Sequence, residues 1–161
     1  FEGGTNTVSA AAGNDTITGS TQSNLMFLGS GNDIVYSEGQ DTIVGDTGAD
    51  TINAVGQALT FNNSASMVFI NTNIGSLVGT STVIGGAGAL SVFGGSGEVT
   101  VFGGSANNEF MLGGTGTTDA LIGGTGSASI FGAGHYNYLA SGTTGADTIV
   151  SASNSTNYMF G

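Results

Sequence analysis

The segment GSGNDIVYSEGQDTIVGDTGADTIN, residues 29–53, decides the fold of this chain. In it, apolar pairs that start at Val35, Ile43 and Ile52 alternate with turns that contain glycine. Similar pairs recur about every nine residues along the chain, a period typical of a β-helix with one short strand and one tight corner in each unit. The first residues of these pairs, or anchors, are Phe1, Val8, Ile17, Phe27, Val35, Ile43, Ile52, Thr60, Phe69, Leu77, Val83, Val92, Val101, Met111, Leu121, Ile130, Leu139, Ile149 and Met159.

The composition agrees with a stack of short strands. The 161 residues include 31 glycines, which supply the backbone torsions that tight corners need, and no proline. A strand that is paired on both sides cannot lose its backbone N–H, so the absence of proline fits a continuous ladder. The segments between the corners are rich in valine, isoleucine, threonine and phenylalanine, which favour strands over helices.

The charge of the chain restricts its partners. It has 11 acidic residues and no lysine or arginine, for a net charge of −11. Nucleic-acid binding needs basic side chains, and an anionic membrane surface would repel this chain, so we expect neither partner and no membrane insertion. The acids lack internal counter-ions, and we expect metal cations from solution to neutralise them. The chain also lacks cysteine and therefore disulfides.

Aspartates mark the best-defined corners. These corners read Gly13-Asn14-Asp15-Thr16-Ile17, Gly29-Ser30-Gly31-Asn32-Asp33, Gly39-Gln40-Asp41-Thr42-Ile43, Gly45-Asp46-Thr47-Gly48-Ala49-Asp50-Thr51-Ile52 and Gly145-Ala146-Asp147-Thr148-Ile149. They resemble the RTX nonapeptide G-G-x-G-x-D-x-U-x, the calcium-binding repeat of secreted bacterial proteins. The resemblance implies an all-β fold, a parallel β-roll or β-solenoid with about nine residues per unit and about eighteen per turn.

The resemblance also implies where calcium binds. Calcium ions lie between corners that are two units apart on one edge of the roll, where glycine carbonyls and aspartate carboxylates supply hard oxygen ligands. We expect sites between Asp15 and Asp33 and between Asp33 and Asp50, and a weaker one between Asn24 and Asp41. The metal-binding residues expected in this way are Asp15, Asp33, Asp50, Asp41, Asn24, Gly13, Gly31, Gly39, Gly48 and Asp147. The alternative is that these aspartates only cap their own turns, without metal.

The corner chemistry divides the chain into three parts. Residues 1–56 are predicted to form a calcium-binding RTX-like roll, residues 57–80 an irregular joint or wider turns, and residues 81–161 a metal-poor, glycine-rich continuation of the stack. In the last part the ligand position falls on Leu90, Val99 and Asn108, and aliphatic side chains cannot bind calcium. Asp119 comes one residue late and faces Asn137, so it has no acidic partner.

The second residue of each apolar pair is also often large. If the anchors fill the core, these residues point outward and form an apolar stripe; alternatively, the roll flattens and covers them. The larger ones are Leu28, Tyr36, Val44, Phe61, Ile70, Ile84, Phe93, Phe102, Leu112, Ile122, Phe131, Val150 and Phe160.

Three functions fit this pattern. The first is a structural, calcium-stabilised segment of a large bacterial adhesin, surface-layer, filament or biofilm-matrix protein. Such a segment would be extracellular or on the cell surface, exported by type I secretion, and associated with copies of itself, neighbouring repeats, the extracellular matrix or a cell surface. The second is a folding and secretion module of a type I-secreted enzyme, and the third is an ice-binding solenoid with threonine columns. We expect the chain to be part of a longer protein and not to be an enzyme itself, because no catalytic motif is present and His135 stands alone.

Overall fold

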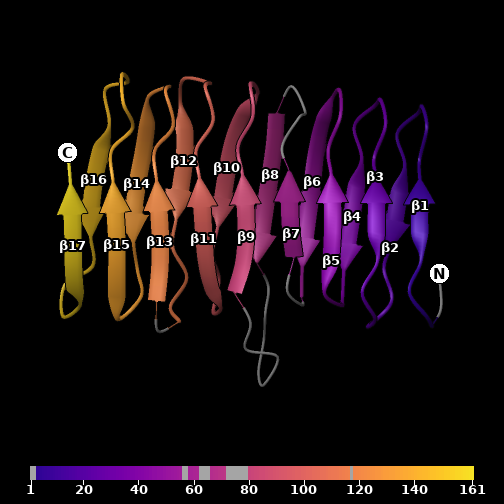
Figure 1. Ribbon diagram of the computed structural model, residues 1–161, viewed down its shortest axis with the longest axis horizontal. Coiled ribbons are helices and arrows are strands. Elements are labelled where there is room, and N and C mark those ends of the chain that lie inside the picture. Colours follow the sequence, from indigo (N-terminus) through magenta and orange to yellow (C-terminus); the bar gives the residue numbers. More distant parts are fainter. Residues whose placement is uncertain (1–2, 56–57, 62–65, 72–79, 117) are drawn as a thin grey trace.

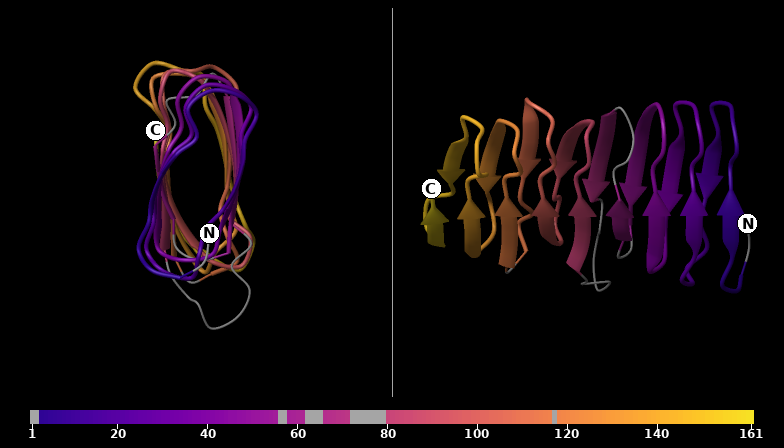
Figure 2. Two further views of the ribbon diagram at one scale, coloured as in Figure 1. Left: turned by 90° about the vertical axis from the view of Figure 1, so that its right-hand side faces the viewer. Right: turned by 45° about the horizontal axis from the view of Figure 1, so that its top comes forward.

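The computed structural model of this chain is a flattened coil of two parallel β-sheets (Figure 1). It describes residues 3–55, 58–61, 66–71, 80–116 and 118–161, and all structural statements below refer to these ranges. Viewed along the long axis, the chain traces an elongated loop whose two long sides are the sheets (Figure 2). The described residues contain no helix, and hence none that could span a membrane.

Alternate strands belong to alternate sheets, so the chain switches sheet at every corner. The odd sheet contains β1 (Thr7–Ser9), β3 (Leu25–Phe27), β5 (Asp41–Val44), β7 (Ala58–Phe61), β9 (Thr80–Ile84), β11 (Glu98–Phe102), β13 (Thr118–Ile122), β15 (Tyr136–Ala140) and β17 (Thr156–Phe160). The even sheet contains β2 (Thr16–Thr18), β4 (Ile34–Ser37), β6 (Ala49–Ala54), β8 (Ser66–Asn71), β10 (Ala89–Phe93), β12 (Glu109–Leu112), β14 (Ala128–Gly132) and β16 (Thr148–Ser151). All pairs of neighbouring strands are parallel, which confirms the predicted β-solenoid.

The strand register gives the length of each turn. Thr7 pairs with Leu25, a step of 18 residues, and Leu25 pairs with Thr42, a step of 17. This agrees with the predicted eighteen or so residues per turn. Between β7 and β9 the step is 23, from Leu59 to Thr82, and residues 72–79 lie outside the described ranges. Both sheets nevertheless continue past this point, because β8 pairs with β6 and with β10.

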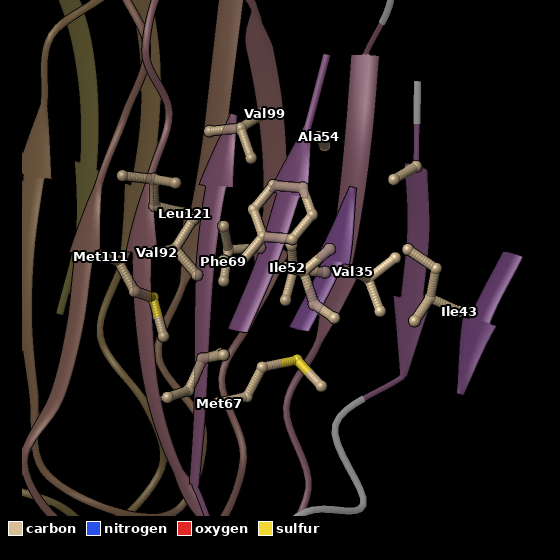
Figure 3. Close-up of a cluster of buried hydrophobic side chains, with 14 of the residues drawn as sticks. Val35, Ile43, Ile52, Ala54, Met67, Phe69, Val92, Val99, Met111 and Leu121 are labelled. Atoms are coloured by element: carbon tan, nitrogen blue, oxygen red, sulfur yellow. The ribbon is translucent and has the colours of Figure 1, made fainter. Parts of the chain in front are cut away.

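The core consists of two columns of inward-facing side chains, one from each sheet (Figure 3). The even-sheet column contains Ile17, Val35, Ile52, Phe69, Val92, Met111, Ile130 and Ile149. The odd-sheet column contains Val8, Met26, Ile43, Thr60, Val83, Val101, Leu121 and Leu139, and Met159, which pairs with Leu139 at the end of the sheet, is 49% exposed. These are the predicted anchors, except that Met26 is fully buried in place of Phe27, which is 41% exposed. Two other anchors, Phe1 and Leu77, lie outside the described residues.

The partners of the anchors point outward, and the roll covers some of them only in part: Val44, Ile84, Leu112, Ile122 and Phe131 are half-buried. Tyr36, Phe93, Phe102, Val150 and Phe160 are exposed, as the first of the two alternatives requires. Leu28 was expected in this set but is fully buried, because it lies two residues after Met26 on the same face. The side chains of Phe61 and Ile70 lie outside the description.

Candidate metal centre

Three aspartates of the first half share one line along the roll. This line runs along the first edge, where the chain passes from an odd strand to the next even strand. An oxygen of Asp33 accepts a hydrogen bond from the backbone N–H of Asp15 at 2.7 Å, and an oxygen of Asp50 accepts one from the N–H of Asp33 at 3.1 Å. Each aspartate therefore reaches the turn before it, because the residues lie 18 and 17 positions apart.

The second carboxylate oxygens at this edge lack partners. The Oδ2 atoms of Asp15 and Asp33 are buried and accept no hydrogen bond, and the side chain of Asp33 is only 1% exposed. A buried charged oxygen without a partner costs free energy, and a bound cation would remove that cost. The two oxygens therefore fit a metal ion at this edge.

Glycines make the corners concave. Gly13, Gly31 and Gly48 have φ angles of 128°, 141° and 132°, which favour glycine. A Cβ on Gly31 would overlap the carbonyl oxygen of Gly13, and a Cβ on Gly48 would overlap that of Gly31. The carbonyl oxygens of Gly13 and Gly31 thus each lie against the glycine of the next turn, in the same corners as the aspartates.

Backbone oxygens have to complete any coordination here. No group of three or more acidic, histidine or cysteine side chains that could hold a metal exists in the described part of the chain. Calcium accepts six to eight oxygen ligands, carbonyls included, and it tolerates irregular geometry. An edge with two carboxylates between adjacent turns, together with glycine carbonyls, suits calcium better than zinc, which prefers nitrogen and sulfur ligands.

A second ladder, which the sequence analysis missed, runs beside the aspartates. The side-chain oxygen of Asn14 accepts a hydrogen bond from the N–H of Asn32 at 2.9 Å, and that of Asn32 accepts one from the N–H of Ala49 at 2.9 Å. The repeated Asn-Asp dipeptides at residues 14–15 and 32–33 were the available signal. This ladder holds the corners together without metal.

The opposite, second edge carries Asn24 and Asp41, and there hydrogen bonds occupy the carboxylate. Asp41 Oδ1 accepts from the backbone N–H and the side-chain amide of Asn24, at 2.9 and 2.7 Å, while Oδ2 accepts from the Ser37 hydroxyl at 2.6 Å. Gly39 lies at the same edge, where a Cβ would overlap the carbonyl oxygen of Gln22. Because Asp41 has protein donors for both oxygens, this edge needs a cation less than the first edge does.

In the second half the first-edge line is mostly apolar. Met67 and Leu90 follow Asp50 on this line, and the line continues through Glu109 and Ala128 to Asp147. The prediction of Asn108 at the ligand position is wrong. Asn108 is exposed with a φ of 66°, and Glu109 takes the inward position with 1% exposure, because this corner is one residue longer than the others.

On the second edge, Val99 and Asp119 take the inward positions, and Asp119 pairs with Asn137 as expected. Asp119 is fully buried, its Oδ1 accepts a hydrogen bond from the Val99 N–H at 3.1 Å, and its Oδ2 has no hydrogen-bond partner. Burial raises the pKa of Asp119 from 3.8 to about 6, the backbone N–H groups of Val99, Gly114 and Gly134 oppose this shift, and the charge on Glu98 adds a smaller rise. The folded chain therefore holds this proton more tightly than the unfolded chain.

Asp119→Asn is expected to stabilise the chain at pH 7 and not at pH 4. A raised pKa favours folding below the unfolded value and loses that contribution as the pH rises through about 6. The penalty at pH 7 is at most about 3 kcal/mol, and asparagine removes it while keeping an oxygen for the Val99 N–H. Urea unfolding of both proteins in chelator from pH 4 to 7 measures the difference. A difference that is constant with pH would contradict the prediction.

A comparison with known families finds a match in the first third of the chain. Residues 2–35 and 37–54 match the family model of the RTX calcium-binding nonapeptide repeat in four copies. No curated protein and no solved structure matches the chain. The matched residues include Asp15, Asp33, Asp41 and Asp50.

Proposed function

We propose that the chain is a calcium-stabilised structural segment of a large extracellular bacterial protein, because residues 2–35 and 37–54 match the model of the RTX family, whose nonapeptide repeats bind calcium. We assign calcium to the first edge, between Asp15 and Asp33 and between Asp33 and Asp50, and a weaker affinity to the Asn24 and Asp41 pair. The unpartnered buried oxygens of Asp15 and Asp33 carry this assignment. Asp147 lies in the second half of the chain and is not part of these first-half sites.

Calcium would couple folding to export. Without cations, three carboxylates that are about 4.8 Å apart along the stack repel one another, and nothing basic in the chain neutralises them. A ligand that binds only the folded state stabilises it in proportion to the logarithm of its concentration. The chain is thus expected to stay unfolded where calcium is scarce and to fold outside the cell. RTX repeats are typical of type I-secreted proteins, which fits this route.

The segment's task would be to span distance and to associate. Neighbouring strands stay in register from β1 to β17, so eight strand spacings give a rod of roughly 40 Å. Strands β1 and β17 each pair on one side only, and such edges accept further strands from a neighbouring repeat or a second copy. We place this rod in an adhesin, surface layer, filament or biofilm matrix.

The other candidates have less support. A folding module of a secreted enzyme would share the calcium edge, and a catalytic domain in the same gene product would distinguish it. For ice binding, threonines would have to form an unbroken column on a flat face. The outward column of the odd sheet instead alternates between threonine and leucine at Leu25, Thr42 and Leu59.

Calcium titration of the full chain tests the proposal. Circular dichroism and thermal unfolding are recorded in chelator, in magnesium and in calcium. We expect unfolded or weakly folded chain in chelator, and β-structure with a sharply higher melting temperature in calcium. A chain with the same melting temperature in all three buffers would disprove the calcium dependence.

Electron microscopy and sedimentation of the calcium-loaded chain test association. Rods that grow in length with protein concentration support stacking through the strand edges. Short, monodisperse rods at all concentrations would leave the spanning role but exclude self-association.

A further inference from the structure

The second half contains a buried carboxylate that the RTX pattern does not explain. Glu109, the first residue of β12, is 1% exposed on the first-edge line. Its Oε1 accepts a hydrogen bond from the Gly104 N–H at 2.8 Å, but its Oε2 is buried and accepts none. Residues 81–161 lie outside the family match, so this orphaned oxygen needs its own account.

Asp147 approaches the same place from the opposite direction. It lies two turns further along the line, where the N–H groups of Ala128 and Gly142 donate to its Oδ1 and Oδ2. An ionised carboxylate has about four acceptor sites, so both oxygens retain capacity for another ligand. The Asp147 side chain therefore extends toward the turn that separates it from Glu109.

Two glycines mark the layers of the stack in which the carboxylates of Glu109 and Asp147 lie. Glu109 Oε2 lies 2.5 Å from the position of a Cβ on Gly103, and Asp147 Oδ2 lies 3.1 Å from that of a Cβ on Gly123. Gly103 and Gly123 follow the paired residues of β11 and β13, so they are adjacent in the stack, about 4.8 Å apart. The two carboxylates thus face adjacent turns although their own residues are two turns apart.

The residue between them on the line is small. Ala128 pairs with Glu109 and is 4% exposed. The next residue, Ser129, pairs with Thr148 of β16, so Ala128 lies beside Asp147. Leu90, the preceding residue on the same line, shows that this position also accepts a large aliphatic side chain. Alanine at 128 therefore places a much smaller side chain between the two acids than the leucine at position 90 would.

Electrostatics agrees that the two acids influence each other. Burial raises the pKa of Glu109 above its ordinary value, the Gly104 N–H lowers it, and the negative charge of Asp147 raises it further. No lysine or arginine exists to compensate either charge. The pair is therefore unfavourable in the folded chain unless a proton or a cation joins it.

We propose that Glu109 and Asp147 bind a divalent, oxygen-preferring cation of the calcium class across Ala128, in the half of the chain without RTX repeats. The glycine turns contain neutral oxygens in the same layers: the carbonyl oxygens of Gly104 and Gly124 lie against Gly124 and Gly142, and each also accepts one backbone hydrogen bond, from Thr125 and Thr143. This site differs from the first-edge sites at Asp15, Asp33 and Asp50 in using a glutamate and in joining turns that are not adjacent. It does not depend on those sites being occupied.

Calorimetric calcium titration of Glu109→Gln tests the site in the full chain after chelator treatment. We expect one ion fewer per chain than in the unsubstituted protein. Glu98→Gln is the matched control, because it removes the same charge from a residue on the outer face that accepts a hydrogen bond from Thr80. An equal ion count for Glu109→Gln and the unsubstituted chain would overturn the proposal, whatever the first-edge sites do.

Thermal unfolding separates cation binding from protonation. Glutamine removes the repulsion of Asp147, so Glu109→Gln is expected to raise the melting temperature in chelator and to lose part of the rise that calcium gives. An equal increase in chelator and in calcium would mean that a proton, not a cation, neutralises the pair, and would overturn the proposal. Ala128→Leu keeps both acids but places a larger side chain between them, and it should also bind one ion fewer.

Discussion

Asp33→Asn is expected to abolish most of the stabilisation that calcium gives to the first half of the chain. Asp33 is the only one of the three first-edge aspartates that lies between two others, so both proposed calcium sites use it. A site filled at one hundred times its dissociation constant contributes about 2.7 kcal/mol, and the loss of two sites amounts to about 5 kcal/mol. Asparagine keeps the oxygen for the Asp15 N–H, so the structural hydrogen bond is retained.

Urea unfolding in calcium and in chelator measures this effect. Asp41→Asn is the matched control, because it removes an equal charge from a carboxylate whose oxygens already accept hydrogen bonds from Asn24 and Ser37. We expect Asp33→Asn to lose most of its response to calcium, and Asp41→Asn to keep most of its own. Equal calcium responses for the two variants would place the ions away from the first edge.

Gly31→Ala is expected to destabilise the chain by about 3 kcal/mol or more, with calcium or without it. Its φ of 141° is unfavourable for any residue with a Cβ, and the added methyl group would overlap the carbonyl oxygen of Gly13. Such backbone strain costs about 1–3 kcal/mol, and relieving the overlap by shifting the turn costs a comparable amount. The shift would also displace the carbonyls that face the aspartates.

Gly13→Ala separates the cost of the backbone torsion from the cost of crowding between the turns. Gly13 has a similar φ of 128°, but nothing lies within 4 Å of its hypothetical Cβ. It should therefore show the torsional cost alone, and calcium affinity should fall much more for Gly31→Ala than for Gly13→Ala. Equal losses of stability for the two variants would mean that crowding between the turns contributes nothing.

The nine-residue period was enough to predict the strand stack, and it failed where the pattern became locally ambiguous. Residues 25–28 read Leu-Met-Phe-Leu, four apolar residues in a row, so alternation could not show which two face inward. The register decides it: Met26 pairs with Val8 and Ile43, both of which face the core. Phe27 was therefore wrongly expected in the core, and Leu28 was wrongly expected on the outer face.

The candidate sites were predictable only where corners have equal lengths. Counting from the glycines aligned Asp15, Asp33 and Asp50, because the steps between them are 18 and 17 residues. After Phe93 the steps grow, with Ser91 paired to Phe110 and thus 19 residues apart. Counting then selects Asn108 in place of Glu109, and the sequence alone offers no measure of corner length. The sequence also cannot show which carboxylate oxygens lack hydrogen-bond partners, because this depends on the folded backbone.

The small, repeated turns of this rod make it behave as a linear array. Each strand packs chiefly against the strands directly before and after it in the same sheet, so a loss of order spreads only from one turn to the next. Depleting calcium from the first-edge sites would therefore fray the rod from its acidic end, where Asp15, Asp33 and Asp50 lie. The length of the ordered part of the rod would then increase with the calcium concentration of the surrounding medium.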